Sequence, residues 1–268
     1  MIISKQFTSL RHNLVRPAAL AMLSCLLLGG LAGSASEPLD ASRLAPLPVT
    51  ITSFGGAIAD GHVYVYGGNL GSAHSYSNDG QNKTLYRLSL DSGKWEEVAQ
   101  GPPLQGLAMV AHDGRLIRLG GFTARNAEGE EHDLWSRDDV ALFNPAADSP
   151  EWQKLPSLPE PRSSFDAAVL GNHVYVIGGW AMAGRDGERV WHDTAWKMDL
   201  SADSPSWEPI ASPSWQRRAL AVAAHDGKIF AIGGMDSGGD TTTATEVYDP
   251  ATDRWSTGPD LADDEPIA

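Results

Sequence analysis

The sequence predicts an all-β protein built from one unit that is written four times. Each unit closes a short apolar run with two glycines, and the first glycines of these pairs are 53, 58 and 55 residues apart. A lone tryptophan follows each pair. The glycines are Gly67, Gly68, Gly120, Gly121, Gly178, Gly179, Gly233 and Gly234, and the tryptophans are Trp95, Trp152, Trp207 and Trp255. Because such a unit cannot bury its own apolar face, neighbouring units must stack.

The composition also favours strands over helices. The 268 residues include 28 Gly and 17 Pro, which are costly inside helices and punctuate strands. No long stretch after residue 36 has apolar residues at the 3.6-residue helical period. One repeated all-β domain is therefore expected.

The third unit shows the predicted pattern of four short strands. The runs cover 165–170, 173–177 and 194–200, and a last run begins at Trp207. Tight turns join the first two runs of each unit, because their dipeptides tolerate positive φ. These dipeptides are Asp60-Gly61, Asp113-Gly114, Gly171-Asn172 and Asp226-Gly227. Four-stranded units of this length are the blades of a β-propeller, here at about 45–101, 102–158, 159–213 and 214–268.

The glycines and tryptophans have structural roles in such blades. A glycine pair at a strand end indicates a close approach of backbones that a Cβ would obstruct. The tryptophan that opens the fourth strand is a large apolar plate, which we expect to pack between neighbouring blades.

This pattern resembles the kelch repeat. The resemblance covers about residues 45–261 and includes an aromatic residue in the third strand and an Asn-Pro or Asp-Pro turn after it, besides the Gly-Gly and Trp positions. The aromatic residues are Tyr86, Phe143, Trp196 and Tyr248, and the turns are Asn144-Pro145 and Asp249-Pro250. The resemblance implies a closed ring of five to seven blades, whereas only four repeats can be counted in this sequence. Three alternatives stay open: a partial or truncated propeller, a small four-blade ring, and two chains that combine, as in a homodimer.

The first 35 residues differ from the rest. Three Lys or Arg and no acid occur in this segment, 17–31 is almost wholly apolar, and 33–35 are small residues that suit a cleavage site. This pattern predicts a secretory signal peptide over 1–35, and hence a periplasmic or secreted protein with no membrane span after its removal. An uncleaved membrane anchor and a lipoprotein modified at Cys25 are the alternatives.

Charge and cysteine content exclude several functions. The formal net charge is −14, and a surface of that sign repels phosphate backbones and anionic membranes. Nucleic acid is therefore not an expected partner. Cys25 is the single cysteine, so a mature chain without it has no disulfide, thiolate metal site or thiol nucleophile. No cofactor is expected.

The candidate binding surface is the rim that collects the segments after the glycine pairs. These post-glycine loops cover 69–83, 122–138, 180–193 and 235–243, and long loops are often functional. Arg162 and Arg217 precede two first strands at equivalent positions and are expected to point towards the axis mouth. In kelch domains that recognise acidic peptides, arginines at this rim bind the carboxylates, as the resemblance implies. The alternative is a structural hydrogen bond to a loop carbonyl.

The sequence leads to a non-enzymatic, ligand- or protein-binding module as the first hypothesis, with a protein or carbohydrate ligand. Its ligand-binding candidates are Arg162, Arg217, Asp166, Trp180, His192 and Asp236.

The alternative is a carbohydrate-active enzyme that resembles the sialic acid mutarotases. Its site would combine Arg162, Asp166 and Trp180 with Arg185, Glu188 and Trp191. The copper-radical oxidases that share the kelch fold need a cysteine cross-link, which excludes them.

No metal site is expected. His74, His132 and His192 fall in post-glycine loops, but no two of them have the spacing of metal ligands on one element.

Overall fold

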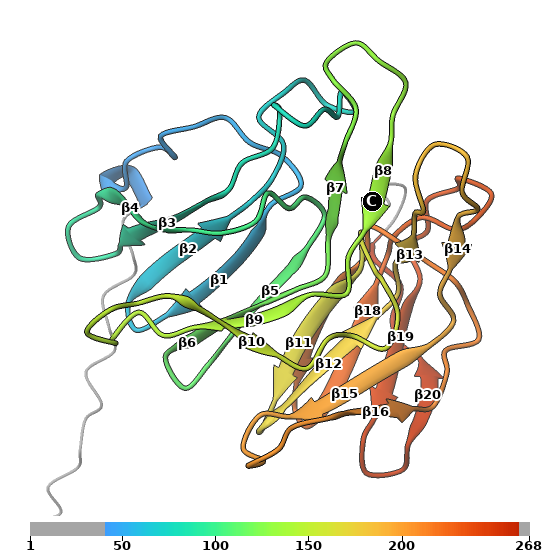
Figure 1. Ribbon diagram of the computed structural model, residues 1–268. Coiled ribbons are helices and arrows are strands. Elements are labelled where there is room, and N and C mark those ends of the chain that lie inside the picture. Colours follow the sequence, from blue (N-terminus) through green and yellow to red (C-terminus); the bar gives the residue numbers. More distant parts are fainter. Residues whose placement is uncertain (1–40, 263–268) are drawn as a thin grey trace, which may run out of the picture. The chain divides into compact units, whose positions relative to one another are not determined.

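The computed structural model describes residues 41–262, and the predicted signal peptide lies outside this range. After a short 3-10 turn, η1 (Ala41–Arg43), strands form four antiparallel sheets of four strands each (Figure 1). This arrangement confirms the predicted all-β class and its four-stranded units. Within 41–262, no helix is long and apolar enough to span a bilayer.

We number the sheets blades 1 to 4 in chain order. Blade 1 contains β1 (Gly55–Ala59), β2 (His62–Tyr66), β3 (Thr84–Ser89) and β4 (Trp95–Gln100). Blade 2 contains β5 (Ala108–His112), β6 (Arg115–Leu119), β9 (Val140–Phe143) and β10 (Trp152–Leu155). Blade 3 contains β11 (Asp166–Leu170), β12 (His173–Ile177), β15 (Ala195–Asp199) and β16 (Trp207–Ile210). Blade 4 contains β17 (Ala221–His225), β18 (Lys228–Ile232), β19 (Thr245–Asp249) and β20 (Arg254–Thr257).

Two post-glycine loops contain strands of their own, which the sequence analysis did not predict. β7 (Phe122–Ala124) pairs with β8 (Leu134–Ser136), and β13 (Trp180–Ala181) pairs with β14 (Val190–Trp191). Each hairpin begins directly after a glycine pair, so the chain continues as a second, smaller sheet beyond the turn that the two glycines make.

The hairpin turns follow the predicted chemistry. In the Asp60-Gly61 and Asp226-Gly227 turns both residues have positive φ, between 45° and 74°. Such a turn matches the twist of the two strands that it joins. In the third blade only Gly171 has positive φ, at 59°, because its turn places glycine first.

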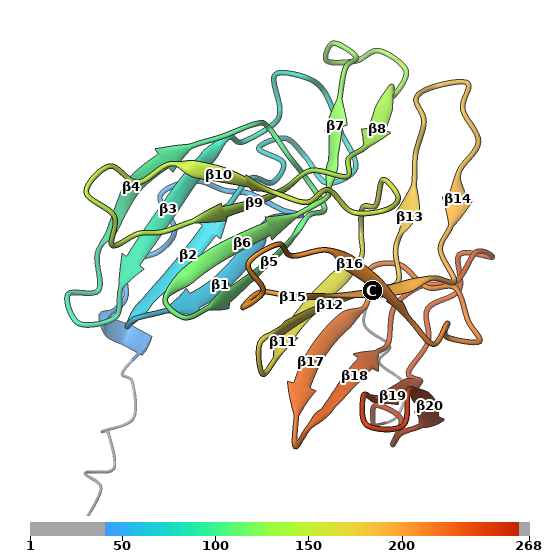
Figure 2. The ribbon, with the colours of Figure 1, turned by 60° about the horizontal axis from the view of Figure 1, so that its bottom comes forward.

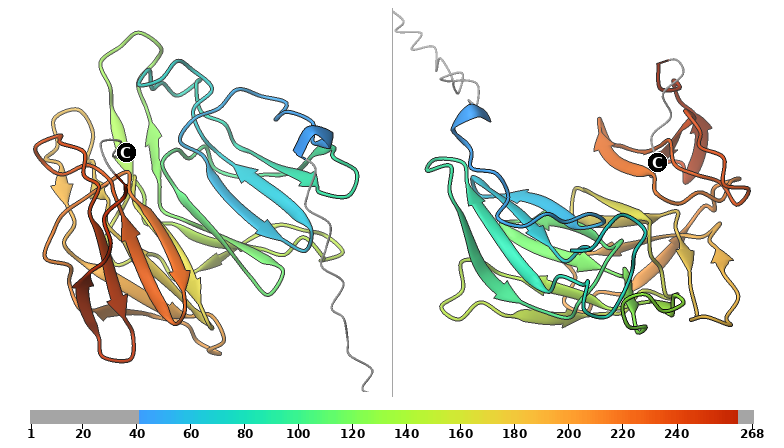
Figure 3. Two further views of the ribbon diagram at one scale, coloured as in Figure 1. Left: turned by 180° about the vertical axis from the view of Figure 1, so that it is seen from behind. Right: turned by 90° about the horizontal axis from the view of Figure 1, so that it is seen from above.

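The inner strands β1, β5, β11 and β17 lie side by side in that order (Figure 2). One buried apolar cluster fills each of the three junctions between neighbouring blades. Leu107, Phe165 and Leu220, at one equivalent position, belong to these three clusters. Blade 1 and blade 4 stand at the two ends of this row (Figure 3).

A chain of backbone hydrogen bonds also links the blades. Gly106 N donates to Ser53 O over 2.7 Å, Ser164 N to Gly106 O over 2.8 Å, and Ala219 N to Ser164 O over 2.7 Å. All four residues have positive φ, from 51° to 56°. This repeated left-handed residue lets each blade attach to the one before it.

The glycine pairs lie where the segment that enters the next blade passes the end of the second strand. Gly121 N donates to Arg162 O over 2.8 Å and Gly179 N to Arg217 O over 2.7 Å. A Cβ on Gly178 would lie 2.7 Å from Arg217 O, closer than real Cβ contacts come. A side chain there would push two blades apart.

The tryptophans fasten the outer strands. Trp207 and Trp255 pack against the clusters at the junction with the preceding blade. Their indole N–H groups donate to the connections that enter their blades, to Pro156 O over 3.0 Å and to Ala211 O over 2.7 Å. Trp152 packs in the same way against the cluster between blades 1 and 2.

Candidate binding site at the mouth of the post-glycine loops

The post-glycine loops lie on one side of the blades, where the β7–β8 and β13–β14 hairpins rise beside the loop after β2 (Figure 1). Side chains and backbone bind these loops together. Gln81 Oε1 accepts from Ala124 N over 2.8 Å, and Asn126 Nδ2 donates to the carbonyl of Tyr76 over 2.7 Å. Ser136 N donates to Met182 O over 2.9 Å. Loops fixed in this way can hold side chains in place for a ligand.

A pocket of about 270 Å³ opens where the loops meet, and we call it the mouth pocket. Every blade contributes to it. Its lining residues are His74, Tyr76, Phe122, His132, Leu134, Ser164, Trp180, Met182, Arg189 and Arg218. Aromatic rings and two guanidinium groups thus face one space, and no carboxylate lines it.

Arg218 is the cation closest to the aromatic wall. Its guanidinium carbon lies 4.5 Å from the centre of the Trp180 ring, and its Nη2 donates to Met235 Sδ over 3.0 Å. Burial lowers the pKa of Arg218, the nearby Tyr76 opposes that shift, and the charge of Arg189 adds to it. Its Nε is buried and has no partner within residues 41–262.

The Trp180 ring stacks with the guanidinium groups of both arginines. Arg189 lies 5.3 Å from its ring centre, and the Trp191 ring lies 5.4 Å away at 57°. Cation–π contacts of this kind orient a guanidinium while leaving its edge free to bind anions.

Tyr76 forms the opposite wall. Its ring meets Phe122 edge-on at 5.3 Å and lies 5.4 Å from the His132 ring. Burial raises the pKa of Tyr76, although the charge of Arg218 works against that rise. The phenol therefore stays neutral at physiological pH and can donate a hydrogen bond.

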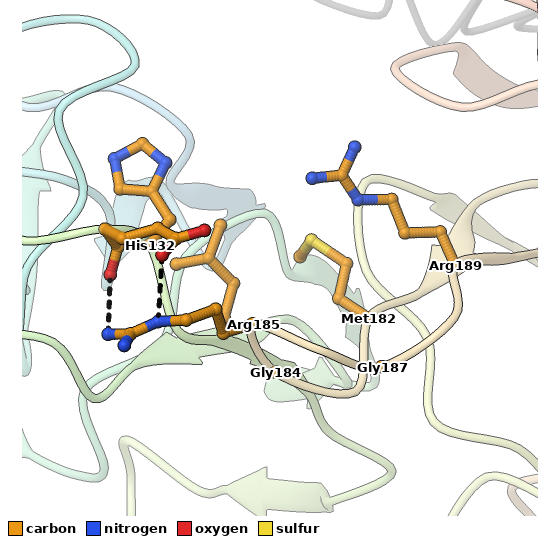
Figure 4. Close-up of a pocket in the computed structure, with 8 residues that line it drawn as sticks. His132, Met182, Gly184, Arg185, Gly187 and Arg189 are labelled. Atoms are coloured by element: carbon orange, nitrogen blue, oxygen red, sulfur yellow. Dashed lines mark hydrogen bonds and ion pairs between the residues drawn. The ribbon is translucent and has the colours of Figure 1, made fainter.

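A second hollow of about 500 Å³ adjoins the mouth pocket and shares His132, Leu134, Met182 and Arg189 with it. Figure 4 shows Arg185 in this hollow, bound to Glu131, while Arg189 stands apart from that pair. Arg185 Nη2 donates to Glu131 O over 3.3 Å. Arg189 is thus the cation available to both hollows.

The structure places the predicted binder Arg162 inside blade 3 instead of in the mouth. The side chain is 1% exposed, and its Nη1 donates to Gly178 O over 2.8 Å and Thr194 O over 2.9 Å. Its Nη2 donates to Glu160 Oε2 over 3.0 Å and to Thr194 Oγ1 over 2.6 Å. Burial lowers the pKa of Arg162 to about 10, against the charge of Glu160. This is the structural alternative, a side chain that binds loop carbonyls.

Arg217 repeats this arrangement in blade 4. Its Nη1 donates to Gly233 O over 3.0 Å and to Ala244 O over 2.8 Å, and its guanidinium stacks on Trp215 at 3.8 Å. In blade 1 the amide of Asn82 donates to the equivalent carbonyl, Gly67 O, over 2.8 Å. Three blades therefore bind the carbonyl of the first glycine with a side chain. The arginines serve that bond, and contact of either with a ligand stays a prediction.

His192 and Asp236 lie outside the mouth pocket, and Asp236 lines a separate hollow of about 340 Å³ together with Arg217. His192 is buried behind Arg162, where its Nε2 lies 3.0 Å from Pro161 O. Burial and the charge of Arg162 lower the pKa of His192. Asp236 shapes its own exposed loop by accepting from Gly238 N over 2.9 Å. Of the six candidates, only Trp180 lines the mouth pocket.

Asp166 links blades 3 and 4. One carboxylate oxygen accepts from Ala167 N and the other from Val222 N, each over 2.8 Å. Burial raises the pKa of Asp166, against these two bonds. Its position explains why it does not meet Arg185 and Glu188, the partners proposed for a sugar site.

Residues 41–262 contain no cluster of three metal-ligating side chains. His74 and His132 flank Tyr76, with ring centres 6.4 Å and 5.4 Å from its own, whereas His192 lies behind Arg162.

Sequence reasoning missed Arg218, Arg189, Tyr76 and Phe122. Phe122 directly follows a glycine pair and Arg218 directly follows Arg217, so two of them stand beside positions that the repeat alignment did select.

A family model described as the KLHDC2/KLHL20/DRC7 Kelch-repeats domain matches residues 57–266. The chain belongs to the kelch-repeat family. Beta-scruin of Limulus polyphemus is 26% identical over 221 residues, which are 79% of this kelch chain and 22% of the scruin. Kelch-like protein 35 of Mus musculus is 26% identical over 227 residues, 83% of this chain and 34% of that protein. The chain thus spans about a fifth to a third of these relatives.

A solved structure, titled "Structure of YjhT", has the same fold as this kelch chain. The TM-score is 0.64 at 23% sequence identity, over 85% of this chain and 70% of the other. The likeness supports the propeller fold that the repeats predicted.

Proposed function

We propose that this kelch propeller is a binding module that takes an acidic ligand at the mouth pocket. The observation that supports it most directly is the lining of that pocket, where Arg218 and Arg189 lie over Trp180 and no carboxylate is present. The chain as a whole carries a formal charge of −14, so a cationic pocket stands out against its surface. A cleft of one sign in such a surface attracts the opposite charge.

The ligand class follows from the walls of the pocket. Carboxylates suit the arginines because a guanidinium offers paired N–H donors. Phe122, Met182 and Trp180 add apolar surface around these charges. A protein segment with an acidic residue beside an aromatic or aliphatic one matches both features, and the adjoining hollow leaves room for its flanking residues.

Fluorescence polarisation with a library of short labelled peptides tests this proposal. Peptides that pair Asp or Glu with an apolar residue should bind, and their amidated Asn or Gln counterparts should bind at least tenfold more weakly. Arg218→Ala should weaken binding by about 10- to 100-fold, since a hydrogen bond to a charged group contributes about 1.5–3 kcal/mol. Equal binding of acidic and amidated peptides would refute the proposal.

Arg87→Ala is the matched control. Arg87 pairs with Glu96 over 2.6 Å on blade 1, and neither residue lines the mouth pocket. Its removal should leave peptide affinity unchanged. A loss as large as that of Arg218→Ala would indicate a general charge effect instead of a site.

A sugar mutarotase is the second candidate, and the pair of indole rings of Trp180 and Trp191 beside Arg218 favours it. Such a pair could stack on a carboxylated sugar. No Asp or Glu lines the mouth pocket, however, to serve as general acid or base. NMR of anomer exchange in sialic acid distinguishes the two functions: a rate unaffected by the protein would exclude the enzyme.

We also propose that the protein acts outside the cytoplasm, as a secreted or periplasmic module. The charge pattern, apolar stretch and small residues of 1–35 support this location. N-terminal sequencing of the protein from its native host should begin close to residue 36. A protein that keeps residue 1 would contradict a cleaved signal peptide.

A further inference from the structure

The first strand of blade 1 presents an apolar face that its counterparts bury. At one equivalent position, Leu107, Phe165 and Leu220 are 5%, 5% and 7% exposed because each packs on the preceding blade. Phe54 holds this position in blade 1 and is 44% exposed. Its blade thus carries the side chain that fills a junction, but no preceding blade is present within residues 41–262.

The same face continues along β1. Ile58 lies four residues after Phe54, so both side chains point to one side of the strand, and it is 67% exposed. Its equivalents Ala111 and Val169 pack against buried clusters. Trp95 also stands outside the three clusters that take up the other outer-strand tryptophans.

Blade 4 presents the complementary face. In blades 1 to 3 the second strand directs two large side chains into the junction with the following blade. These pairs are fully or almost fully buried: Tyr64 and Tyr66, Ile117 and Leu119, and Tyr175 and Ile177. Their counterparts Phe230 and Ile232 in β18 are only partly buried, and Ala223 beside them is exposed.

The hydrogen-bond chain between blades ends in the same way. Its last acceptor is Ala219 O and its first donor is Ser53 N, and neither has a partner within residues 41–262. At the inner junctions these two groups are the ones that bond, over 2.7 to 2.8 Å. The blade 1 end of the row therefore carries the donor Ser53 N and the exposed Phe54 ring. The blade 4 end carries the acceptor Ala219 O and the partly buried side chains of β18.

We propose that a second copy of this chain occupies both ends, with blade 4 of each copy packed on blade 1 of the other. Phe54 then takes the place that Leu220 has between blades 3 and 4, and Ser53 N donates to Ala219 O of the second copy. Two such contacts close a ring of eight blades, which is one more than the kelch propellers described above have and the upper end of the range of β-propellers in general. A contact between two different faces closes only if the rotation allows it, and otherwise forms open chains.

Sedimentation velocity of the purified protein over a wide concentration range tests this pairing. The wild-type chain should sediment at twice the mass of one chain. Phe54→Asp with Ile58→Asp should sediment as a single chain, because a charge cannot enter the apolar junction. Val190→Asp is the control, since Val190 is 52% exposed on β14 and outside both faces, and it should keep the double mass. A wild-type single chain at every concentration, or open chains, would overturn the proposal.

Disulfide trapping tests the pairing without placing a charge in the junction. Ser53→Cys and Ala219→Cys are made as separate proteins, each with Cys25 replaced by Ser. Oxidation of the mixture should give a cross-linked pair of unlike chains, whereas each protein alone should give none. Cross-links within one variant, or no cross-link in the mixture, would contradict the contact. Peptide binding at the mouth pocket does not depend on this result.

Discussion

Replacement of Arg162 by Leu separates a structural arginine from a binding one. The blade 2 equivalent is Leu104, so the apolar side chain itself fits this position in the repeat. In blade 3, however, Leu would leave the buried carbonyls of Gly178 and Thr194 without their donor. It would also leave Glu160 without its guanidinium partner, at 3.0 Å.

The expected cost follows from these contacts. A buried group left without a partner costs about 1–3 kcal/mol, and breaking a buried ion pair costs about 3–5 kcal/mol. Glu160 keeps 36% of its side chain exposed, so water recovers part of its loss. We expect Arg162→Leu to lower the free energy of unfolding by about 3–4 kcal/mol, a large share of the 5–15 kcal/mol typical of a domain.

Urea unfolding followed by tryptophan fluorescence measures this change. Arg185→Leu is the control, because Arg185 is 44% exposed and holds Glu131 only at 3.5 Å, and it should change stability by less than about 0.5 kcal/mol. If Arg162→Leu were as stable as the wild type but lost peptide binding, the structural interpretation would be wrong and the sequence prediction of a ligand contact would stand.

Three further predictions concern the blades. Burial raises the pKa of Glu160, but a hydrogen bond from a hydroxyl group and nearby positive charge outweigh burial and hold this pKa below 4.5. The wild type should therefore be more stable than Glu160→Gln above that pH and should lose this advantage as the pH falls through the lowered pKa. Urea unfolding at a series of pH values measures this difference. Gly178→Ala should lower the free energy of unfolding by about 3 kcal/mol in thermal unfolding, because its Cβ would lie 2.7 Å from a backbone oxygen. Gly227→Ala should lower it by only about 1–2 kcal/mol, because Gly227 has a similar φ but open space around it. Trp255→Phe should lose about 1 kcal/mol with its indole hydrogen bond, whereas Trp152 has no such bond to lose.

The repeat made the fold predictable, because its glycines and turn dipeptides demand backbone geometry that few other residues allow. The mouth was harder to predict. Adjacent residues of an extended chain point to opposite sides, and Ala219 then turns the backbone with a φ of 53°. Arg217 therefore enters the blade while Arg218 reaches the pocket. The repeat alignment selected Arg217 alone, because sequence position does not show on which side of the backbone each arginine lies.

The partners of Arg162 were also hidden from the sequence. Glu160 lies two residues before it, but Thr194 is 32 residues away and meets it only when the loop folds back. The sequence predicts a post-glycine loop over 122–138 where the structure has the β7–β8 hairpin, because the two strands are only three residues long and the stretch between them is polar.

The mouth pocket takes residues from every blade, as Tyr76, Phe122, Trp180 and Arg218 illustrate. The affinity of the pocket for a ligand therefore depends on the fraction of molecules in which all four blades are in place. A substitution at a distant junction that opens the row in half of the molecules would double the apparent dissociation constant without touching the ligand. Conversely, a ligand at a hundred times its dissociation constant would add about 2.7 kcal/mol to the intact row.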